Sequence, residues 1–267
     1  MDGRRTALAS GRYGTFEGLL DDAVVFGHYR EHGDWSPALI DLVCDRLRPA
    51  TVLDVGANIG LFSVPVAQRS EARCLAFEPV ADNYALLRAN VERHGMGGRV
   101  LTRQVAVYSQ RAQLTMALSP DNSGDHHVSE RATSARTVGV EADTLDALLA
   151  GEALSPPVVM KIDTQGSELR VIKGASGVLP QVDHCIVEYW PAGLSRLGDR
   201  PRALRDALDG FAYAALLPQD GGPVELSETA QLWARLDYLS DDDPGFFDVL
   251  LTRTAELPGG GAGGRGG

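Results

Sequence analysis

The sequence predicts an α/β protein built on one mostly parallel sheet, with helices on both faces and an antiparallel edge strand. Two observations carry this prediction. From residue 51 onward, apolar runs typical of buried strands alternate with amphipathic segments typical of helices, and this alternation indicates parallel strands joined by helical crossovers. The last two apolar runs, FAYAALL and GFFDVLLTR, follow each other as strands and would supply the antiparallel edge.

Each element is assigned from its local pattern. Strands are expected where short apolar runs end in a turn residue or an acid. A helix is expected over SPALIDLVCDRL, where Ser36 can cap the first turn ahead of Pro37, and another over ADNYALLRANVERHG, which Gly95 closes. The other expected strands, two of which form an interrupting hairpin, are TVLDV, RCLAF, RVLTRQVAV, QLTMAL, ARTVGVEA, VVMKI and CIVEYWP.

Composition limits the function classes. The 267 residues are 44% hydrophobic, which suffices for one substantial core. No apolar run approaches the roughly 18 residues of a membrane span, and the N-terminal stretch lacks the apolar core of a signal peptide, so we expect a cytoplasmic protein with no membrane partner. The three cysteines are far apart and odd in number, which predicts buried thiols rather than disulfides. A net charge of −11 weighs against nucleic acid and favours a small molecule or a peptide.

The stretch TVLDVGANIG, residues 51–60, is the strongest indication of a ligand site. It reads as a strand, a glycine-bearing turn and the start of a helix, and such a turn lets a ligand approach the backbone closely. A dinucleotide fingerprint would need a second glycine where Asn58 stands, so S-adenosylmethionine fits better than a pyrophosphate. We predict that Asp54, Gly56, Asn58 and Gly60 bind this cofactor, with Asp54 accepting from its ammonium group directly or through water. The alternatives are a nicotinamide dinucleotide and a structural turn without a ligand.

Two further strand ends complete the predicted cofactor site. Glu78, followed by Pro79, comes about 20 residues after the glycine turn, which is the spacing of an acid that binds ribose hydroxyls. The alternative is a solvated surface glutamate. Gln104 and Ala106 lie at the carboxyl end of the next strand and are expected beside the adenine, because ligands bind beyond the carboxyl ends of parallel strands.

The candidate catalytic groups lie in two other segments. Asp163 follows the strand VVMKI, so it should enter the same crevice as Asp54 and Glu78. His126 and His127 lie in a polar loop of the hairpin, and either can accept a proton, because the ordinary pKa of histidine is about 6.5. The alternative is that both are exposed loop histidines.

The predicted substrate end lies beyond Asp163. Glu168 begins the following helix, either as an ordinary helix-start acid or as a substrate contact. Glu188 and Trp190 end the strand CIVEYWP, where an aromatic ring can form the wall of a pocket or belong to the core. Asp163 and Glu188 also offer oxygen ligands for a divalent metal, but the spacing contains no complete ligand set, so no metal site is predicted.

The chain resembles the FkbM-type family of S-adenosylmethionine-dependent methyltransferases over about residues 24–253, and four segments carry the resemblance: VLDVGANIGLFS, AFEP, KIDTQGSELRVIKGA and IVEYWP. The resemblance implies a class I methyltransferase (Rossmann-like) fold with seven strands. It also implies O-methylation of a hydroxyl, often in natural-product or sugar pathways. The family pattern is matched by Asp54, Gly56, Asn58 and Gly60 in the cofactor loop, Glu78 as the ribose acid, and Asp163, Gly166 and Glu168 in the acid-rich turn. Gln165 stands where the family more often has glutamate, which weakens any role for a second turn carboxylate, including metal binding.

The resulting hypothesis is an O-methyltransferase that uses S-adenosylmethionine on a small-molecule hydroxyl in secondary metabolism, such as antibiotic biosynthesis. The acceptor hydroxyl must approach the methyl carbon in line and lose its proton, for which His126, His127 and Asp163 are the candidates. We expect residues 1–35 to form an arm or lid over the pocket, residues 36–254 the methyltransferase domain, and residues 255–267 a disordered Gly-rich tail. The alternatives are a non-catalytic cofactor-binding scaffold and a nicotinamide-dependent oxidoreductase.

Overall fold

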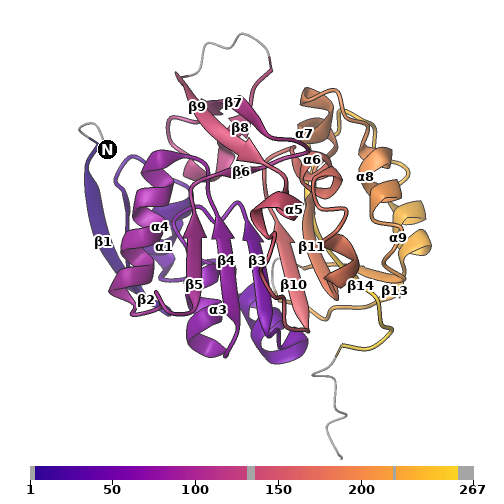
Figure 1. The fold of residues 1–267 in the computed structure, drawn as a ribbon, viewed down its shortest axis with the longest axis horizontal. Coiled ribbons are helices and arrows are strands. Elements are labelled where there is room, and N and C mark those ends of the chain that lie inside the picture. The colour runs from indigo at the N-terminus through magenta and orange to yellow at the C-terminus, as the bar shows by residue number, and fades with distance from the viewer. Residues whose placement is uncertain (1–3, 131–135, 219–220, 258–267) are drawn as a thin grey trace, which may run out of the picture.

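The computed structural model describes residues 4–130, 136–218 and 221–257, and its centre is one large sheet covered by helices on both faces (Figure 1). The eight strands of this sheet are, in spatial order, β13 (Ser227–Glu228), β12 (Tyr213–Leu216), β14 (Phe247–Thr252), β11 (His184–Tyr189), β10 (Val158–Ile162), β3 (Thr51–Val55), β4 (Arg73–Phe77) and β5 (Val100–Arg103).

Most strands of this sheet run in the same direction. The neighbours from β11 to β5 pair in parallel, whereas β14 inserts between β11 and β12 and is antiparallel to both. The predicted α/β class with a mostly parallel sheet is therefore confirmed. The expected seven strands become eight, because the short β13 adds an antiparallel pair at the edge beyond β12.

Different helices cover the two faces of the sheet, because successive side chains of a strand point to opposite faces. Val52 of β3 packs into a cluster with α3 (Ser63–Arg69) and α4 (Ala81–Arg93). Its neighbour Leu53 packs into a second cluster with α6 (Glu168–Lys173) and α8 (Pro201–Ala207). Every residue of β3 is buried, so this strand is the centre of the core. The remaining helices of this domain are α5 (Leu145–Leu148), α7 (Pro191–Arg196), α9 (Thr229–Arg235) and the single turn η3 (Leu179–Gln181).

A smaller sheet stands beyond the carboxyl ends of the large one, at the top of Figure 1. Its strands are, in spatial order, β6 (Ala106–Val107), β9 (Arg136–Asp143), β7 (Ala112–Leu118) and β8 (His127–Val128). The antiparallel pair β7 and β9 confirms the predicted hairpin. The strand predicted over residues 99–107 is wrong as one element: the chain turns at the exposed Gln104 and passes from β5 in the large sheet to β6 in the small one.

The N-terminal segment forms an ordered layer. It contains the hairpin of β1 (Thr6–Gly11) and β2 (Gly14–Leu19), followed by α1 (Val25–His32). Phe16 and Phe26 are completely buried in the cluster that includes α4. Asn90 of α4 fixes β2, because it accepts from the Glu17 amide at 2.7 Å and donates to the Glu17 carbonyl at 3.0 Å.

Other predictions about local structure have mixed outcomes. The helix expected after Ser36 is present as α2 (Pro37–Asp41), continued by the π-helical turn η1 (Leu42–Leu47). The capping role of Ser36 is wrong, because its backbone is left-handed, with φ of 44°, and its side chain caps no helix amide.

All three cysteines are free and buried, as predicted. No described helix has the length and apolar character needed to cross a membrane. Within the expected tail, Leu257 is buried, and residues 258–267 lie outside the described residues.

The central position of β3 yields a stability prediction. Leu53→Ala removes a completely buried side chain and should lower the free energy of unfolding by about 2–5 kcal/mol, because the site can collapse only partly around the cavity. Leu8→Ala is the control. Leu8 is 56% exposed on β1, so this substitution should change the free energy of unfolding by no more than about 0.5 kcal/mol. Urea unfolding measures both, and equal losses would contradict the assignment of β3 as the core strand.

Candidate functional site

A cleft of about 1270 Å³ lies at the carboxyl ends of β3, β4, β10 and β11. Nine of the sequence-predicted site residues line it, and five do not. Those that line it are Gly56, Asn58, Glu78, Pro79, Ala106, His126, Asp163, Glu188 and Trp190. Those whose side chains lie elsewhere are Asp54, Gly60, Gln104, His127 and Glu168.

The glycine turn after β3 is shaped by backbone geometry that other residues would disturb. Gly56 has φ of 89°, and a Cβ added there would lie 1.9 Å from the Asp163 carbonyl oxygen. Asn58 also has a left-handed backbone, with φ of 50°. Glycine is therefore required where the turn passes against the end of β10, and the missing side chain leaves backbone open to the cleft.

Glu78 borders this turn at the end of β4. Its Oε2 accepts from the Asn58 amide and its Oε1 from the Val80 amide, both at 2.9 Å. Burial raises the pKa of Glu78 from its usual 4.5 to about 7, and these two backbone amides oppose the rise. The carboxyl is fixed in place at the cleft, with oxygen lone pairs left for a further donor such as a diol.

Asp54 is placed differently from its prediction. It is completely buried and does not line the cleft. Its Oδ2 accepts from the Ser63 hydroxyl at 2.5 Å, and its Oδ1 lies 4.0 Å from the ammonium of Lys161. In this arrangement Asp54 holds the Ser63 hydroxyl near the start of α3 and faces Lys161, and its contact with a cofactor ammonium, directly or through water, stays a prediction.

Two other predicted cofactor residues also lie outside the cleft. Gly60 has φ of 91°, and a Cβ there would lie 2.9 Å from a methyl group of Leu87, so this glycine serves the packing of the turn on α4. Gln104 is exposed in the turn between β5 and β6, which directs its side chain to solvent. The cleft wall at this point is made by Val105, Ala106 and Val107 instead.

Two carboxyl groups and one amide form the other end of the cleft. The Gln165 side-chain amide donates to Asp163 Oδ1 at 3.1 Å and to Glu188 Oε2 at 3.0 Å. Gln165 has a left-handed backbone, with φ of 54°, which turns its side chain back between the two acids. A glutamate at this position would bring a third carboxylate against the other two, so the amide stabilises the pair by hydrogen bonds.

Two residues that were not predicted from the sequence, Lys161 and Asp248, also line this end of the cleft. The Lys161 ammonium lies 3.1 Å from Asp163 Oδ2. Burial alone would lower the pKa of Lys161, but Asp163 and Asp54 outweigh it and raise the pKa. Asp248 of β14 stands opposite Glu188 of β11 in the antiparallel register. The i,i+2 spacing of Lys161 and Asp163 on one strand face was a usable signal, whereas the position of Asp248 depends on strand register.

Burial and neighbouring acids alter the proton affinity of this cluster. The pKa of Glu188 is raised well above its usual value, first by burial and then by the negative charges of Asp163, Glu168 and Asp248. Burial and Asp163 also raise the pKa of Asp248. Within the described residues, no group of three or more His, Cys, Asp or Glu side chains has a geometry that could hold a metal ion.

Glu168 is a structural acid of the turn after β10. It is completely buried, and its Oε1 accepts from the amides of Thr164 and Gly166 at 3.0 and 3.1 Å. The carboxylate folds back onto the turn that precedes it, which fits the alternative of a helix-start acid, and the substrate contact stays a prediction. Trp190 does line the cleft, and the Arg196 guanidinium stacks 4.4 Å from its ring centre, which holds the indole as a wall.

Neither predicted histidine is arranged as a base. His126 is 7% exposed, and its Nδ1 accepts from the Ser119 amide at 3.1 Å, which places the ring proton on Nε2. Burial lowers the pKa of His126 to about 4. His127 belongs to β8 and does not line the cleft. Of the three predicted catalytic residues, Asp163 is therefore the one that lines the cleft with an atom still able to accept a proton.

The strand order, with antiparallel β14 between β11 and β12, and the glycine turn after β3 define a class I methyltransferase fold. A family model described as the methyltransferase FkbM domain matches residues 54–213. The chain therefore belongs to the FkbM methyltransferase family, and the predicted resemblance is confirmed.

Two relatives and one solved structure are similar to this chain. The chain is 33% identical over 207 residues to the 31-O-demethyl-FK506 methyltransferase FkbM of Streptomyces tacrolimicus, covering 66% of this chain and 77% of the relative. It is 31% identical over 152 residues to the hexuronic acid methyltransferase AglP of Haloferax volcanii, covering 56% of this chain and 60% of that protein. Among solved structures, an O-methyltransferase from Bacillus cereus in complex with SAH matches with a TM-score of 0.45 and 13% identity, over 82% of each chain.

The buried carboxyl of Glu78 yields a pH prediction. Because its folded pKa of about 7 exceeds the usual 4.5, Glu78 contributes stability that is fully present below pH 4.5 and is lost as the pH rises through about 7. Relative to Glu78→Gln, the free energy of unfolding of the unmodified protein should fall by about 3 kcal/mol across this range. Urea unfolding at a series of pH values measures the difference.

The control for this prediction is Glu152→Gln. Glu152 pairs with Arg73 and Arg103 away from the cleft, and hydrogen bonding to Arg73 lowers its pKa. Relative to Glu152→Gln, the unmodified protein should therefore show no fall in the free energy of unfolding toward high pH, because both proteins keep Glu78. A pH-independent difference between Glu78→Gln and the unmodified protein would contradict the raised pKa of Glu78.

Proposed function

We propose that the protein is an S-adenosylmethionine-dependent O-methyltransferase that acts on a hydroxyl of a small molecule. One observation carries the proposal: the same cleft is lined by a glycine turn with a fixed acid, Glu78, and by a cluster of carboxyl groups that includes Asp163. These two parts of the cleft are adjacent, because Gly56 packs against the backbone of Asp163. Methyl transfer needs this division, with a cofactor at one end and an acceptor that loses a proton at the other.

The residues at the cofactor end fit S-adenosylmethionine. The open backbone at Gly56 admits a close ligand, Glu78 offers carboxyl oxygens to a ribose diol, and Ala106 offers an apolar surface to a base. When bound, the cofactor supplies the electrophilic methyl group. A pyrophosphate finds no second glycine, because Asn58 occupies that position and its amide hydrogen already bonds Glu78.

The acceptor end supports a hydroxyl substrate. The Asp163 carboxylate lies 3.1 Å from the Lys161 ammonium and can accept the proton of the acceptor hydroxyl. Glu188, which holds a proton more tightly than an ordinary glutamate, can donate a hydrogen bond to the acceptor. Trp190 and the half-exposed Phe246 give this end an aromatic wall. The relatives are named for methylating 31-O-demethyl-FK506 and hexuronic acid, and a natural product or sugar is the acceptor class we propose.

A calorimetric titration tests the cofactor class. S-Adenosylhomocysteine should bind in the micromolar range and NADH should not bind. Glu78→Ala should weaken binding at least tenfold, about 1.4 kcal/mol, because the ribose diol loses its acceptor. Glu152→Ala is the matched control, since Glu152 does not line the cleft, and should leave binding unchanged. NADH binding in place of S-adenosylhomocysteine would overturn the proposal in favour of an oxidoreductase.

Turnover tests the assignment of the base. With an acceptor found by screening hydroxylated natural products and sugars, Asp163→Asn should lower kcat by about 100- to 10,000-fold, while the affinity for S-adenosylhomocysteine changes less than about tenfold. His127→Ala is the control and should keep full turnover, because its ring lies outside the cleft. Full turnover of Asp163→Asn would remove Asp163 from the mechanism, and a loss confined to His126→Ala would return the role to the histidine. A wild-type protein that binds the cofactor but releases no methylated product would favour the scaffold alternative.

A further inference from the structure

The loop between β7 and β8 is attached to the cofactor turn through Ser123. This serine is 5% exposed and belongs to the single helical turn η2 (Ser123–Asp125). Its carbonyl oxygen accepts from the side-chain amides of Asn58 at 2.9 Å and Asn83 at 3.2 Å. The loop therefore rests on both the glycine turn and the start of α4.

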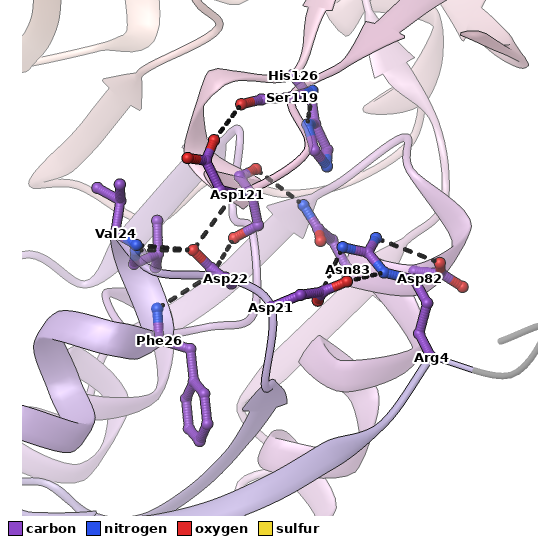
Figure 2. Close-up of polar contacts among 12 residues, drawn as sticks. Arg4, Asp21, Asp22, Val24, Phe26, Asp82, Asn83, Ser119, Asp121 and His126 are labelled. Carbon is purple, nitrogen blue, oxygen red and sulfur yellow. Dashed lines mark hydrogen bonds and ion pairs between the residues drawn. The ribbon is translucent and has the colours of Figure 1, made fainter. Parts of the chain in front are cut away.

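Asp22 attaches the same serine to the N-terminal segment. It is 2% exposed, and its carboxylate accepts from the amides of Val24, Val25 and Phe26 at 3.0–3.2 Å, which begins α1 (Figure 2). The same carboxylate accepts from the Ser123 hydroxyl at 2.6 Å. One buried acid thus fixes the start of a helix and a loop 101 residues further along the chain.

These contacts form a continuous path to the cofactor end. Asp22 bonds Ser123, Ser123 bonds Asn58, and the Asn58 amide bonds Glu78. A second link is the hydrogen bond from the Ala23 amide to the Asp121 carbonyl at 2.8 Å. The N-terminal helix is therefore connected by a chain of hydrogen bonds to the acid proposed to hold the ribose.

The connected segments roof the cleft. Val24 and Val25 of the N-terminal segment and Asn122 and Gly124 of the loop all line it. The packing between them is close, because a Cβ on Gly124 would lie 3.0 Å from a methyl group of Val25. The roof lies over the turn that carries Asn58, so a cofactor in the cleft would be enclosed by it.

Two unsatisfied polar atoms lie at the contact between the roof and the rest of the site. His126 Nε2 of the loop and Asn83 Oδ1 of α4 are buried and have no hydrogen-bond partner among the described residues. A buried unpaired group is unfavourable, and water can pair with both atoms when the loop lifts. The closed state thus depends on the Asp22 and Ser123 contacts, which oppose this tendency to open.

We propose that Asp22 and Ser123 are positioning residues that hold the N-terminal helix and the β7–β8 loop closed over the cofactor turn, and that cofactor exchange requires their hydrogen bond to open. The proposal rests on the proposed function, because it concerns the exchange of that cofactor. It also names the hydrogen bond, from Ser123 to Asp22, that would hold the lid predicted for residues 1–35 in place.

Ser123→Ala is the decisive variant. It removes the hydroxyl that bonds Asp22 at 2.6 Å and also lies 3.2 Å from Asn58 Oδ1. It keeps the carbonyl that bonds Asn58 and Asn83 and leaves only the longer contact of the Ser123 amide with Asp22, at 3.4 Å, and Asp22 can still begin α1. Surface plasmon resonance with immobilised protein should show that S-adenosylhomocysteine dissociates about tenfold faster from this variant. Its association should also become faster, because the roof opens more often. Asp22→Asn should shift both rates in the same direction.

Asp21→Asn is the matched control. Asp21 is adjacent in sequence but pairs with Arg4 at the surface, with a side chain that is 52% exposed (Figure 2). Its loss should change neither rate. Unchanged rates in Ser123→Ala would overturn the proposal, whatever the change in thermal stability, because a purely structural role lowers stability without opening the site.

Hydrogen exchange of the free protein separates this proposal from the proposed function. Ser123→Ala should speed amide exchange at residues 24–26, although the substitution lies in a distant loop, and Asp21→Asn should not. If S-adenosylhomocysteine does not bind the unmodified protein, the proposed function fails, but the exchange rates at residues 24–26 still show whether Asp22 and Ser123 hold the helix and the loop together. Unchanged exchange at residues 24–26 in Ser123→Ala would overturn that role.

Discussion

The in-register parallel pairing of β3 with β4 and β10 is the constraint on which the rest of the structure depends. Val55 stands opposite Phe77 on one side and Ile162 on the other, so the three strands end at the same level. The residues that follow them must then share one small space. That crowding is why position 56 accepts no side chain, and it also places the fixed carboxyl of Glu78 and the charged Asp163 on two sides of one turn.

The buried charges around this turn are balanced by one cation. Lys161 is nearly enclosed, with 12% of its side chain exposed, and it faces both Asp54 and Asp163. Removing one partner of such a group leaves an unpaired charge in a medium that solvates it poorly. The lysine therefore pairs with Asp163 at one end of the cleft. Beside this pair, burial and neighbouring negative charges raise the pKa values of Glu188 and Asp248.

The sequence predicted the fold and the cofactor turn because these depend on short-range signals, namely alternating elements and glycines at strand ends. It failed where the face or register of a strand decides the outcome. Asp54 was expected at the ligand, but its strand face turns it inward to Ser63. Glu168 folds back onto its own turn. Asp248 meets Glu188 only through an antiparallel pairing between segments about 60 residues apart, and no local pattern in the chain specifies that register.

The floor and the roof of the cleft are held by different kinds of interaction. The floor is tied by backbone pairing along β3, β4 and β10, which opens only when the core unfolds. The roof is tied by a few separate hydrogen bonds, chiefly those of the Asp22 carboxylate and of the hydroxyl and backbone carbonyl of Ser123, and these can separate while the sheet stays intact. A site built in this way can keep its catalytic geometry while the roof opens, and for that reason ligand exchange is assigned to the N-terminal segment and the β7–β8 loop rather than to the strand ends.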